Sequence, residues 1–276
     1  MVLSKYLGSY CHCADCECLF VEQPMWLEEA YEEALNVYDT GAVSRTLTMG
    51  PLLAGILALH CESDGPYLDF AGGYGLLARY MRDIGFDYFW TDEFAKNLFA
   101  RGFEGSLDTN YVAVSAFELF EHLPDPVDLL ERLGKITDTI VFSTELWAGK
   151  PPEPDVWRYY GFEHGQHVIF YSARALGILA DRFGYHFFSD GHAVHVLTKR
   201  PDPQNALASF LTRGRIPRRA LPAGLLRGPN RFPWSLRTAR CIRRHELFQH
   251  VSSTLSSRTL RDHQALKDFA KPESTS

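Results

Sequence analysis

The sequence predicts an α/β domain in which helices cover both faces of a mostly parallel sheet that ends in an antiparallel strand. Three observations favour this class. A short apolar run, residues 66–70, breaks into glycines and continues as a helical pattern. A second short strand, residues 87–91, then closes a βαβ unit. Toward residue 200, two strands at 185–189 and 193–198 are joined through Asp190 and Gly191, residues that are typical of hairpin turns.

Length and composition suit a globular chain of this class. Its 276 residues are 46% apolar, which is enough for one domain of about 200 residues with additions. No apolar run approaches the ~20 residues that a membrane span needs, and no signal peptide opens the chain. We therefore expect a cytoplasmic protein without a transmembrane span.

Composition divides the chain into four parts. We expect a Cys-rich knuckle at 1–24, a helical N-terminal cover at 25–62, the α/β domain at 63–200 and a basic extension at 201–276, disordered over its last residues.

The extension holds 14 Lys and Arg against 5 Asp and Glu, although the whole chain carries a net charge of −6. Arginines stand there beside apolar anchors such as Trp234, and a helix is expected at residues 238–250. The basic tail could contact its own acidic domain, a dimer mate or an anionic surface, and charge complementarity favours the acidic domain. Nucleic acid is not the expected partner.

Four cysteines, Cys11, Cys13, Cys16 and Cys18, crowd into eight residues. The spacing of Cys13 and Cys16 is that of half a zinc site, but a closed zinc site needs four ligands. Either Cys11, Cys18 or His12 completes the set, or the site has decayed, or these are free thiols. Such clustering suits a reducing compartment better than a disulfide framework.

Two helices are expected before the glycine turn, at residues 25–37 and 43–60. The first carries Trp26 and Tyr31, and the second carries Arg45. These side chains either pack against one edge of the sheet or cover a substrate.

After the turn, a helix at 74–84 and the strand ending before Asp92 complete the βαβ unit. Another helix is expected at 94–101, and residues 102–110 offer only a weak third strand.

A buried strand at 111–116 then runs into Phe117 and a short acidic turn that ends at His122. Asp125 and Pro126 predict the start of a helix, because aspartate caps helices and proline is favoured at the first helical position. The strand at 139–144 leads into a long loop, residues 145–171, that is rich in aromatic side chains and histidine. A loop of this length over strand ends is usually functional.

The acid before the glycine turn indicates the kind of ligand. A carboxylate at Asp69 would not help to bind a phosphate, whereas it suits a ligand with an ammonium group or hydroxyls. The glycines let such a ligand approach the main chain. Asp92 lies 23 positions after Asp69, where a nucleotide-binding α/β fold places the carboxylate that accepts two ribose hydroxyls.

Two motifs carry a resemblance to a known family. Residues 68–75 resemble the acid-x-Gly-x-Gly-x-Gly signature of class I S-adenosylmethionine-dependent methyltransferases, and residues 117–123 resemble their later Glu-x-x-Glu-His element. The resemblance covers residues 67–198 and implies a Rossmann-like sheet of seven strands, the third of them shortened. One departure is Ala71, which replaces the first glycine and should be accepted if the backbone there has an ordinary conformation.

The resemblance implies S-adenosylmethionine as the cofactor and assigns roles to particular residues. Asp69 would act on the ammonium end and Asp92 on the ribose. The residues expected to bind the cofactor are Asp69, Ala71, Gly72, Gly73, Tyr74, Gly75, Asp92, Phe117 and Glu118.

The same resemblance, together with proton chemistry, selects catalytic candidates. A hydroxyl acceptor must lose a proton, so His167, His122 and His164 are candidate bases, with Glu121 beside them. Alternatively, Glu118, Glu121, His122 and His167 bind one divalent ion, as similar elements bind magnesium in plant small-RNA methyltransferases. In other relatives the Glu-His pair only braces the loop.

The N-terminal segment resembles bacterial members that act on saccharides of surface polysaccharides or on secondary metabolites. We therefore expect O-methylation of a saccharide-like or small-molecule acceptor. One alternative is a nicotinamide-dependent oxidoreductase, although its Gly-x-Gly-x-x-Gly spacing is not met. The other is an inactive fold that serves as a binding or scaffold module.

Overall fold

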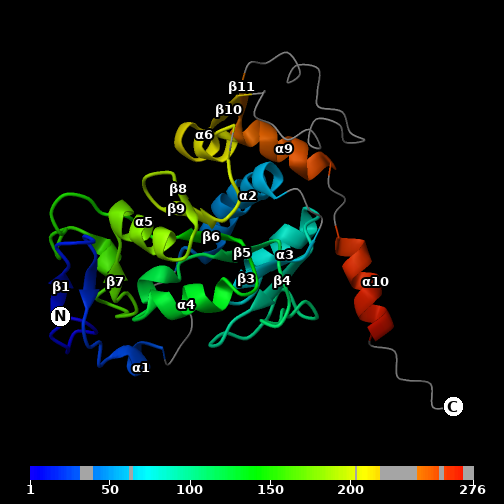
Figure 1. Ribbon diagram of the computed structural model, residues 1–276. Coiled ribbons are helices and arrows are strands. Elements are labelled where there is room, and N and C mark those ends of the chain that lie inside the picture. Colours follow the sequence, from blue (N-terminus) through cyan, green and yellow to red (C-terminus); the bar gives the residue numbers. More distant parts are fainter. Residues whose placement is uncertain (32–39, 62–64, 203, 218–240, 255–257, 270–276) are drawn as a thin grey trace.

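A central six-stranded sheet organises the computed structural model, which describes residues 1–31, 40–61, 65–202, 204–217, 241–254 and 258–269 (Figure 1). The strand order is β4-β3-β5-β6-β9-β8. The strands are β3 (Tyr67–Phe70), β4 (Tyr88–Thr91), β5 (Ala113–Ala116), β6 (Thr139–Ser143), β8 (His186–Ser189) and β9 (Val194–Thr198). Neighbours from β4 to β6 are parallel, and β9 runs antiparallel to both β6 and β8. The predicted α/β class is confirmed.

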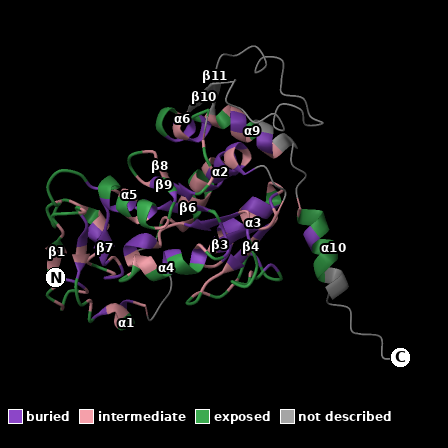
Figure 2. Cartoon of the chain, viewed as in Figure 1, coloured by how far each residue is buried: buried purple, intermediate pink, exposed green. Residues whose placement is uncertain are grey.

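Each central strand is buried on both faces, as parallel sheets require. Along β5, β6 and β9, Ala113, Val141 and Val196 join one hydrophobic cluster, while their neighbours Val114, Ile140 and Leu197 join the other. The first cluster includes side chains of α2 (Ala42–His60), α3 (Leu76–Asp83), α6 (Ala206–Arg213) and α9 (Arg244–Thr254). The second includes α4 (Pro126–Leu133) and α5 (Ala173–Arg182). Helices therefore cover both faces, and burial is deepest along the sheet (Figure 2).

The region between β4 and β5 differs from the prediction. The weak third strand predicted at 102–110 is reduced to a single bridge between Trp90 and Glu104, so the sheet has six strands within the described residues. The helix predicted at 94–101 is a series of turns and bends. Asp92 accepts from the N–H groups of Phe94 and Ala95, as a helix cap would, but Asn97 Oδ1 accepts from Ala100 N, a donor that a helix would pair with the carbonyl four residues earlier. This local bond of Asn97 competes with helix formation.

The N-terminal residues join the long loop through a second sheet. Strands β1 (Tyr10–His12) and β2 (Leu19–Val21) form a hairpin, and β2 pairs with β7 (Ile169–Phe170). Helix α1 (Leu27–Ala30) follows and is shorter than the helix predicted at 25–37, because Met25, Trp26 and Tyr31 lie in turns; residues 32–37 lie outside the described residues. The sequence pattern did not predict this sheet.

Helix α2 begins and ends within one residue of its prediction. By length and composition alone it is apolar enough to cross a membrane, and no other helix in the described parts of the chain meets that test. Its buried side chains, among them Leu53, Ile56 and Leu57, pack in the first cluster with α3, α6 and α9. Such packing is typical of a core helix.

The basic extension contacts the rest of the chain in two places, one on the helical cover and one on the α/β domain. The helix predicted at 238–250 is wrong at its start, because Cys241–Arg243 form strand β11, which pairs with β10 (Arg215–Pro217), and helix α9 begins only at Arg244. Helix α9 packs on α2, and helix α10 (Thr259–Phe269) lies beside α3 and β4. Arg258 pairs with Asp87 at 3.0 Å, as the charge excess suggests, but the buried Asp262 of α10 pairs with Arg82 of α3 at 2.7 Å. Trp234 and the expected disorder at 271–276 lie outside the described residues.

Candidate functional site

The glycine turn follows β3 directly and reaches α3 through left-handed backbone. Gly73 and Gly75 have φ of +55° and +85°, conformations that glycine adopts at little cost. A Cβ built on Gly73 meets nothing within 4 Å, so its outer side is open. At Gly72 the same Cβ would lie 2.6 Å from Asp69 Oδ2, so only glycine lets the turn pass this close to the carboxylate.

Ala71 corrects an expectation, because its backbone is not in an ordinary conformation. Its φ is +55°, in the left-handed region that costs a residue with a Cβ about 1–2 kcal/mol. The alanine therefore adds strain at the position where the signature that residues 68–75 resemble has its first glycine.

Ala71→Gly should raise the free energy of unfolding by about 1 kcal/mol, because glycine relieves this strain at some cost in chain entropy. Urea denaturation measures the difference. Ala208→Gly, in the interior of α6, is the matched control and should lower stability by about 1 kcal/mol. A destabilised Ala71→Gly variant would contradict the assigned strain.

Asp69 lies under the turn and is almost fully buried. Its Oδ1 accepts a hydrogen bond from Ser115 Oγ at 2.8 Å, while its Oδ2 has no partner. Burial raises the pKa of Asp69 to about 7, the Asp92 charge adds to the rise, and the Ser115 bond offsets part of it. An unpaired buried carboxylate oxygen beside an open glycine turn suits a cationic ligand.

Asp92 connects the turn to the loop that follows β4. Its Oδ2 accepts from Gly73 N at 2.8 Å, and its Oδ1 accepts from Phe94 N and Ala95 N at 2.8 and 2.7 Å. Because a carboxylate oxygen has two acceptor positions, Oδ2 keeps one for a further donor. Asp92 therefore orders both segments and still has capacity for a ligand hydroxyl.

Phe117 and Tyr74 are half-buried at the borders of this region. Phe117 packs against the first hydrophobic cluster. Tyr74 accepts backbone bonds from Leu98 and Phe99 through its carbonyl, which ties the glycine turn to the loop after Asp92.

The acidic turn begins at the carboxyl end of β5, next to the glycine turn at the end of β3. Glu118 has φ +51° and is held by Ser143, whose Oγ accepts from Glu118 N at 2.8 Å and donates to its Oε1 at 2.5 Å. Glu121 is fully buried, and neither of its carboxylate oxygens has a hydrogen-bond partner. Burial, reinforced by the charge of Glu118, raises the pKa of Glu121 to about 8.

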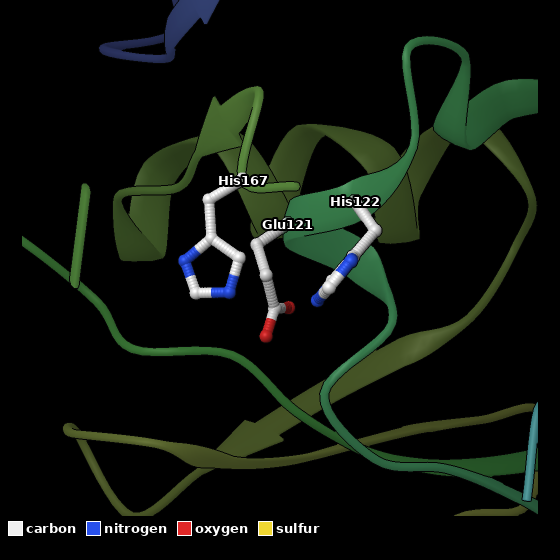
Figure 3. Close-up of side chains that lie close together, drawn as sticks. All are labelled: Glu121, His122 and His167. Carbon is white, nitrogen blue, oxygen red and sulfur yellow. The ribbon is translucent and has the colours of Figure 1, made fainter. Parts of the chain in front are cut away.

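His122 and His167 lie on either side of the Glu121 carboxylate (Figure 3). One ligand atom from each of these three residues lies within 4.8 Å of the other two. His122 Nδ1 is hydrogen-bonded to the Tyr31 hydroxyl at 2.7 Å, and His167 Nδ1 donates to the Tyr159 carbonyl at 2.5 Å. A carbonyl can only accept, so the lone pair of His167 is on Nε2.

Desolvation disfavours the charged form of both imidazoles. It lowers the pKa of His167 to about 3, with a smaller contribution from the charge of His164, and it lowers the pKa of His122 well below the ordinary range. His164 lies beside His167, with ring centroids 4.8 Å apart, but neither His164 nor Glu118 belongs to the compact group of three.

The cysteines form no comparable group. Cys13 and Cys18 face each other where the β1–β2 hairpin opens, Cys16 lies in the loop between them, and Cys18 is buried against β7. Bonds from the backbone N–H of Cys16 lower the pKa of Cys13, whereas burial raises that of Cys18 to about 12. Among the residues that the structure describes, no third metal-binding side chain joins Cys13 and Cys16 in a compact group.

Three residues of the site were not singled out as site residues from the sequence. Ser115 binds Asp69, Ser143 binds Glu118, and Tyr159 lies against His167. Their roles depend on contacts across the sheet or with the long loop, and a single sequence carries no signal for these pairings.

Comparison with known proteins assigns the fold. The family described as a methyltransferase domain matches residues 45–189, more than half of the chain. No curated protein matches the sequence.

Solved structures similar to the chain share little of its sequence. CalO1, a methyltransferase of calicheamicin biosynthesis in its SAH-bound form, is 14% identical with a TM-score of 0.40, over 56% of this chain and 55% of that one. PhzM, a pyocyanin biosynthetic protein, is 15% identical with a TM-score of 0.43, over 64% and 61%. Human N-acetylserotonin methyltransferase in complex with SAM is 14% identical with a TM-score of 0.39, over 64% and 66%. The chain thus spans between about half and two thirds of these proteins.

The domain match, the Rossmann-like sheet and the glycine turn agree with each other and with the signature at residues 68–75. The chain therefore belongs to the methyltransferase-domain family, the class I S-adenosylmethionine-dependent methyltransferases, and not to the nicotinamide-dependent oxidoreductases.

Proposed function

We propose that the chain transfers a methyl group from S-adenosylmethionine to a hydroxyl of a saccharide-like or other small-molecule acceptor. One observation carries the proposal. The open glycine turn with the unpaired Asp69 oxygen follows β3, and Glu121 and His122 follow the neighbouring parallel strand β5, where the loop after β6 brings His167 beside them. Their carboxyl ends meet at one edge of the sheet, the usual ligand site of open α/β folds.

The residues of the turn fit the cofactor. Asp69 Oδ2 would accept from the α-ammonium group, the turn at 71–75 would pass beside the amino-acid part, and Asp92 would accept from a ribose hydroxyl. Phe117 and Tyr74 are candidates for apolar contact, and Glu118 lies at the start of the adjoining turn. When bound, the cofactor supplies a methyl group on a sulfonium, which is transferred in line to the acceptor, so alignment of the acceptor provides much of the rate.

His167 is the group best placed to accept the acceptor's proton. Its Nδ1–H is held by the Tyr159 carbonyl, so Nε2 presents a lone pair toward the space beside Glu121. Buried surroundings disfavour charge on His167, so the proton would pass onward. Glu121 in its ionised form would receive it, because its raised pKa of about 8 makes it the stronger base, with His122 and His164 beside the pair.

A second arrangement is favoured by the same geometry. Two imidazoles whose Nδ1 atoms are already engaged, facing a buried carboxylate with no partner, form a donor set that suits a divalent ion such as magnesium or zinc. Such an ion would hold the acceptor hydroxyl and lower its pKa. Glu118 would enter this set only by leaving Ser143.

The saccharide-like acceptor rests on the resemblance of the N-terminal segment to enzymes of polysaccharide biosynthesis, and a cytoplasmic location agrees with it. Calorimetry with S-adenosylhomocysteine and NADH tests the cofactor. Transfer of a labelled methyl group to a panel of sugars, nucleotide sugars and phenols tests the acceptor. Binding of NADH alone, or methylation of amines in place of hydroxyls, would overturn the proposal.

Asp69→Asn should weaken S-adenosylhomocysteine binding by 10- to 100-fold at pH 8, because a charge-assisted bond to the ammonium is lost. In the wild type the carboxyl must ionise to bind. With a pKa of about 7, its affinity should fall about tenfold for each pH unit below 7. Calorimetry between pH 5.5 and 8.5 measures both effects.

The raised pKa also has a consequence for stability. A carboxyl whose folded pKa is about 7 favours the folded state below the unfolded value near 4, and this contribution is lost as the pH rises through 7. Asp69→Asn should remove the pH dependence of S-adenosylhomocysteine affinity and this pH dependence of stability. Asp181 is an exposed acid on α5, so Asp181→Asn should change neither. A wild-type affinity that does not vary with pH would contradict the role of Asp69.

A further inference from the structure

We infer that Tyr31 is a positioning residue of the acceptor site, through which the N-terminal segment orients His122 and closes against the loop that follows Asp92. The inference rests on the proposed function, since it concerns the same site. No sequence motif points to it, because Tyr31 and His122 are 91 positions apart and meet only in the folded chain.

The hydroxyl contact determines which nitrogen of His122 is available. Tyr31 and His122 Nδ1 are 2.7 Å apart, so Nδ1 is occupied and Nε2 is the nitrogen left for the site. A tyrosine has only two χ angles, so little side-chain entropy is lost when packing on one side of the ring holds it in place. Its hydroxyl can then fix the plane of the imidazole that it binds. Loss of such an outer partner typically costs 10- to 100-fold in the function of the ligand that it orients.

Tyr31 is itself held by the histidine-bearing loop. It ends helix α1, and Trp26 Nε1 before that helix donates to the Gly165 carbonyl at 2.8 Å. Gln166 Nε2 donates to the Ala30 carbonyl at 2.9 Å. Residues 165 and 166 immediately precede His167, so one short segment of the loop fixes both His167 and the backbone beside Tyr31.

The ring of Tyr31 makes the second contact. It stacks on Phe94, with ring centroids 5.0 Å apart and planes 26° from parallel. The backbone N–H of Phe94 donates to Asp92 Oδ1, and Asp92 Oδ2 accepts a hydrogen bond from Gly73 N. Phe94 is 61% exposed, and the stacked tyrosine ring covers part of its apolar surface. The N-terminal segment thus bridges the acceptor group and the cofactor turn.

Two substitutions separate the contacts. Tyr31→Phe keeps the ring that stacks on Phe94 and removes only the hydroxyl, whereas Phe94→Leu removes the stack and keeps the hydroxyl. Tyr6→Phe is the matched control, because the Tyr6 hydroxyl also serves the N-terminal segment, bonding Glu29 Oε2 at 2.9 Å, but it does not touch the site.

The measurements are kcat and KM for the acceptor, S-adenosylhomocysteine affinity by calorimetry, and the ¹⁵N signals of the His122 ring by NMR. Tyr31→Phe should lower kcat by 10- to 100-fold, change KM by less than threefold, leave S-adenosylhomocysteine affinity unchanged and shift the His122 signals. Phe94→Leu should raise KM while the His122 signals stay as in the wild type. Tyr6→Phe should match the wild type throughout.

A Tyr31→Phe enzyme with kcat within twofold of the wild type, or with unchanged His122 signals, would overturn the inference. If the wild type transfers no methyl group, the proposed function fails, but the NMR comparison still decides whether Tyr31 orients His122. If Tyr31→Phe does not fold, unchanged KM in Phe94→Leu overturns the closing role.

Discussion

Replacing His167 with alanine is expected to lower kcat for methyl transfer by about 10²- to 10⁴-fold, the usual contribution of a positioned base. His167 Nε2 is the one imidazole nitrogen of the group of three whose lone pair is set by a carbonyl, so its loss removes the proton acceptor or one arm of an ion site. Binding of S-adenosylhomocysteine should be unaffected, because the glycine turn keeps all its contacts. Initial rates with labelled cofactor and calorimetry measure the two quantities.

The matched control is His186→Ala, at an exposed histidine on β8, which should retain full activity. Exhaustive chelation then distinguishes the two arrangements of the site. Activity that is lost on chelation and restored by magnesium or manganese assigns an ion to the group, whereas full retention leaves His167 as a base. Wild-type kcat in His167→Ala would contradict both.

Replacing Arg82 with methionine is expected to lower the free energy of unfolding by about 3 kcal/mol, the lower end of the cost of breaking a buried ion pair. Arg82 is 2% exposed and binds the Asp262 carboxylate through two nitrogens, each at 2.7 Å. It also donates to the Tyr88 carbonyl at 2.8 Å and lies over the Phe103 ring. Arg79 still reaches Asp262 at 3.0 Å, which keeps the cost at the lower end.

Urea denaturation measures this change, and limited proteolysis should show earlier cleavage within α10, because Asp262 anchors that helix to α3. Arg132→Met is the matched control. Its pair with Asp128 spans 3.8 Å between exposed side chains and should contribute less than about 1 kcal/mol. A loss below 1 kcal/mol in Arg82→Met would show that the ion network does not hold α10.

Local chemistry was the part of the fold that could be read from the chain. The glycine turn, the cap at Asp125 and the hairpin at Asp190 each depend on residues within a few positions, and all three occur where they were expected. The helix expected at 94–101 did not form, and the reason is also local, since the Asn97 side chain binds the Ala100 N–H that a helix would need.

Long-range pairings could not be read from the chain. The β1–β2–β7 sheet joins residues about 150 positions apart, and the left-handed conformation of Ala71 is imposed by its place between β3 and the turn. The acidic turn and the histidine loop were both singled out, but the separation of Glu118 from the group of three depends on its bonds with Ser143. Loop-closure entropy and packing decide such contacts. Neither produces a repeating residue pattern that could be recognised in a single sequence.

The sequence by itself determined most of the strands and helices, the family signature and the residue types of the site. These depend on backbone chemistry and on the period of the hydrophobic residues. Only the tertiary structure showed that the Glu121 carboxylate is buried without a hydrogen-bond partner. It also showed that His122 Nδ1 is hydrogen-bonded to Tyr31 and that His167 Nδ1 is hydrogen-bonded to the Tyr159 carbonyl. The reason is physical. Burial and hydrogen-bond geometry are properties of the packed chain, and they set the protonation state and orientation on which catalysis depends.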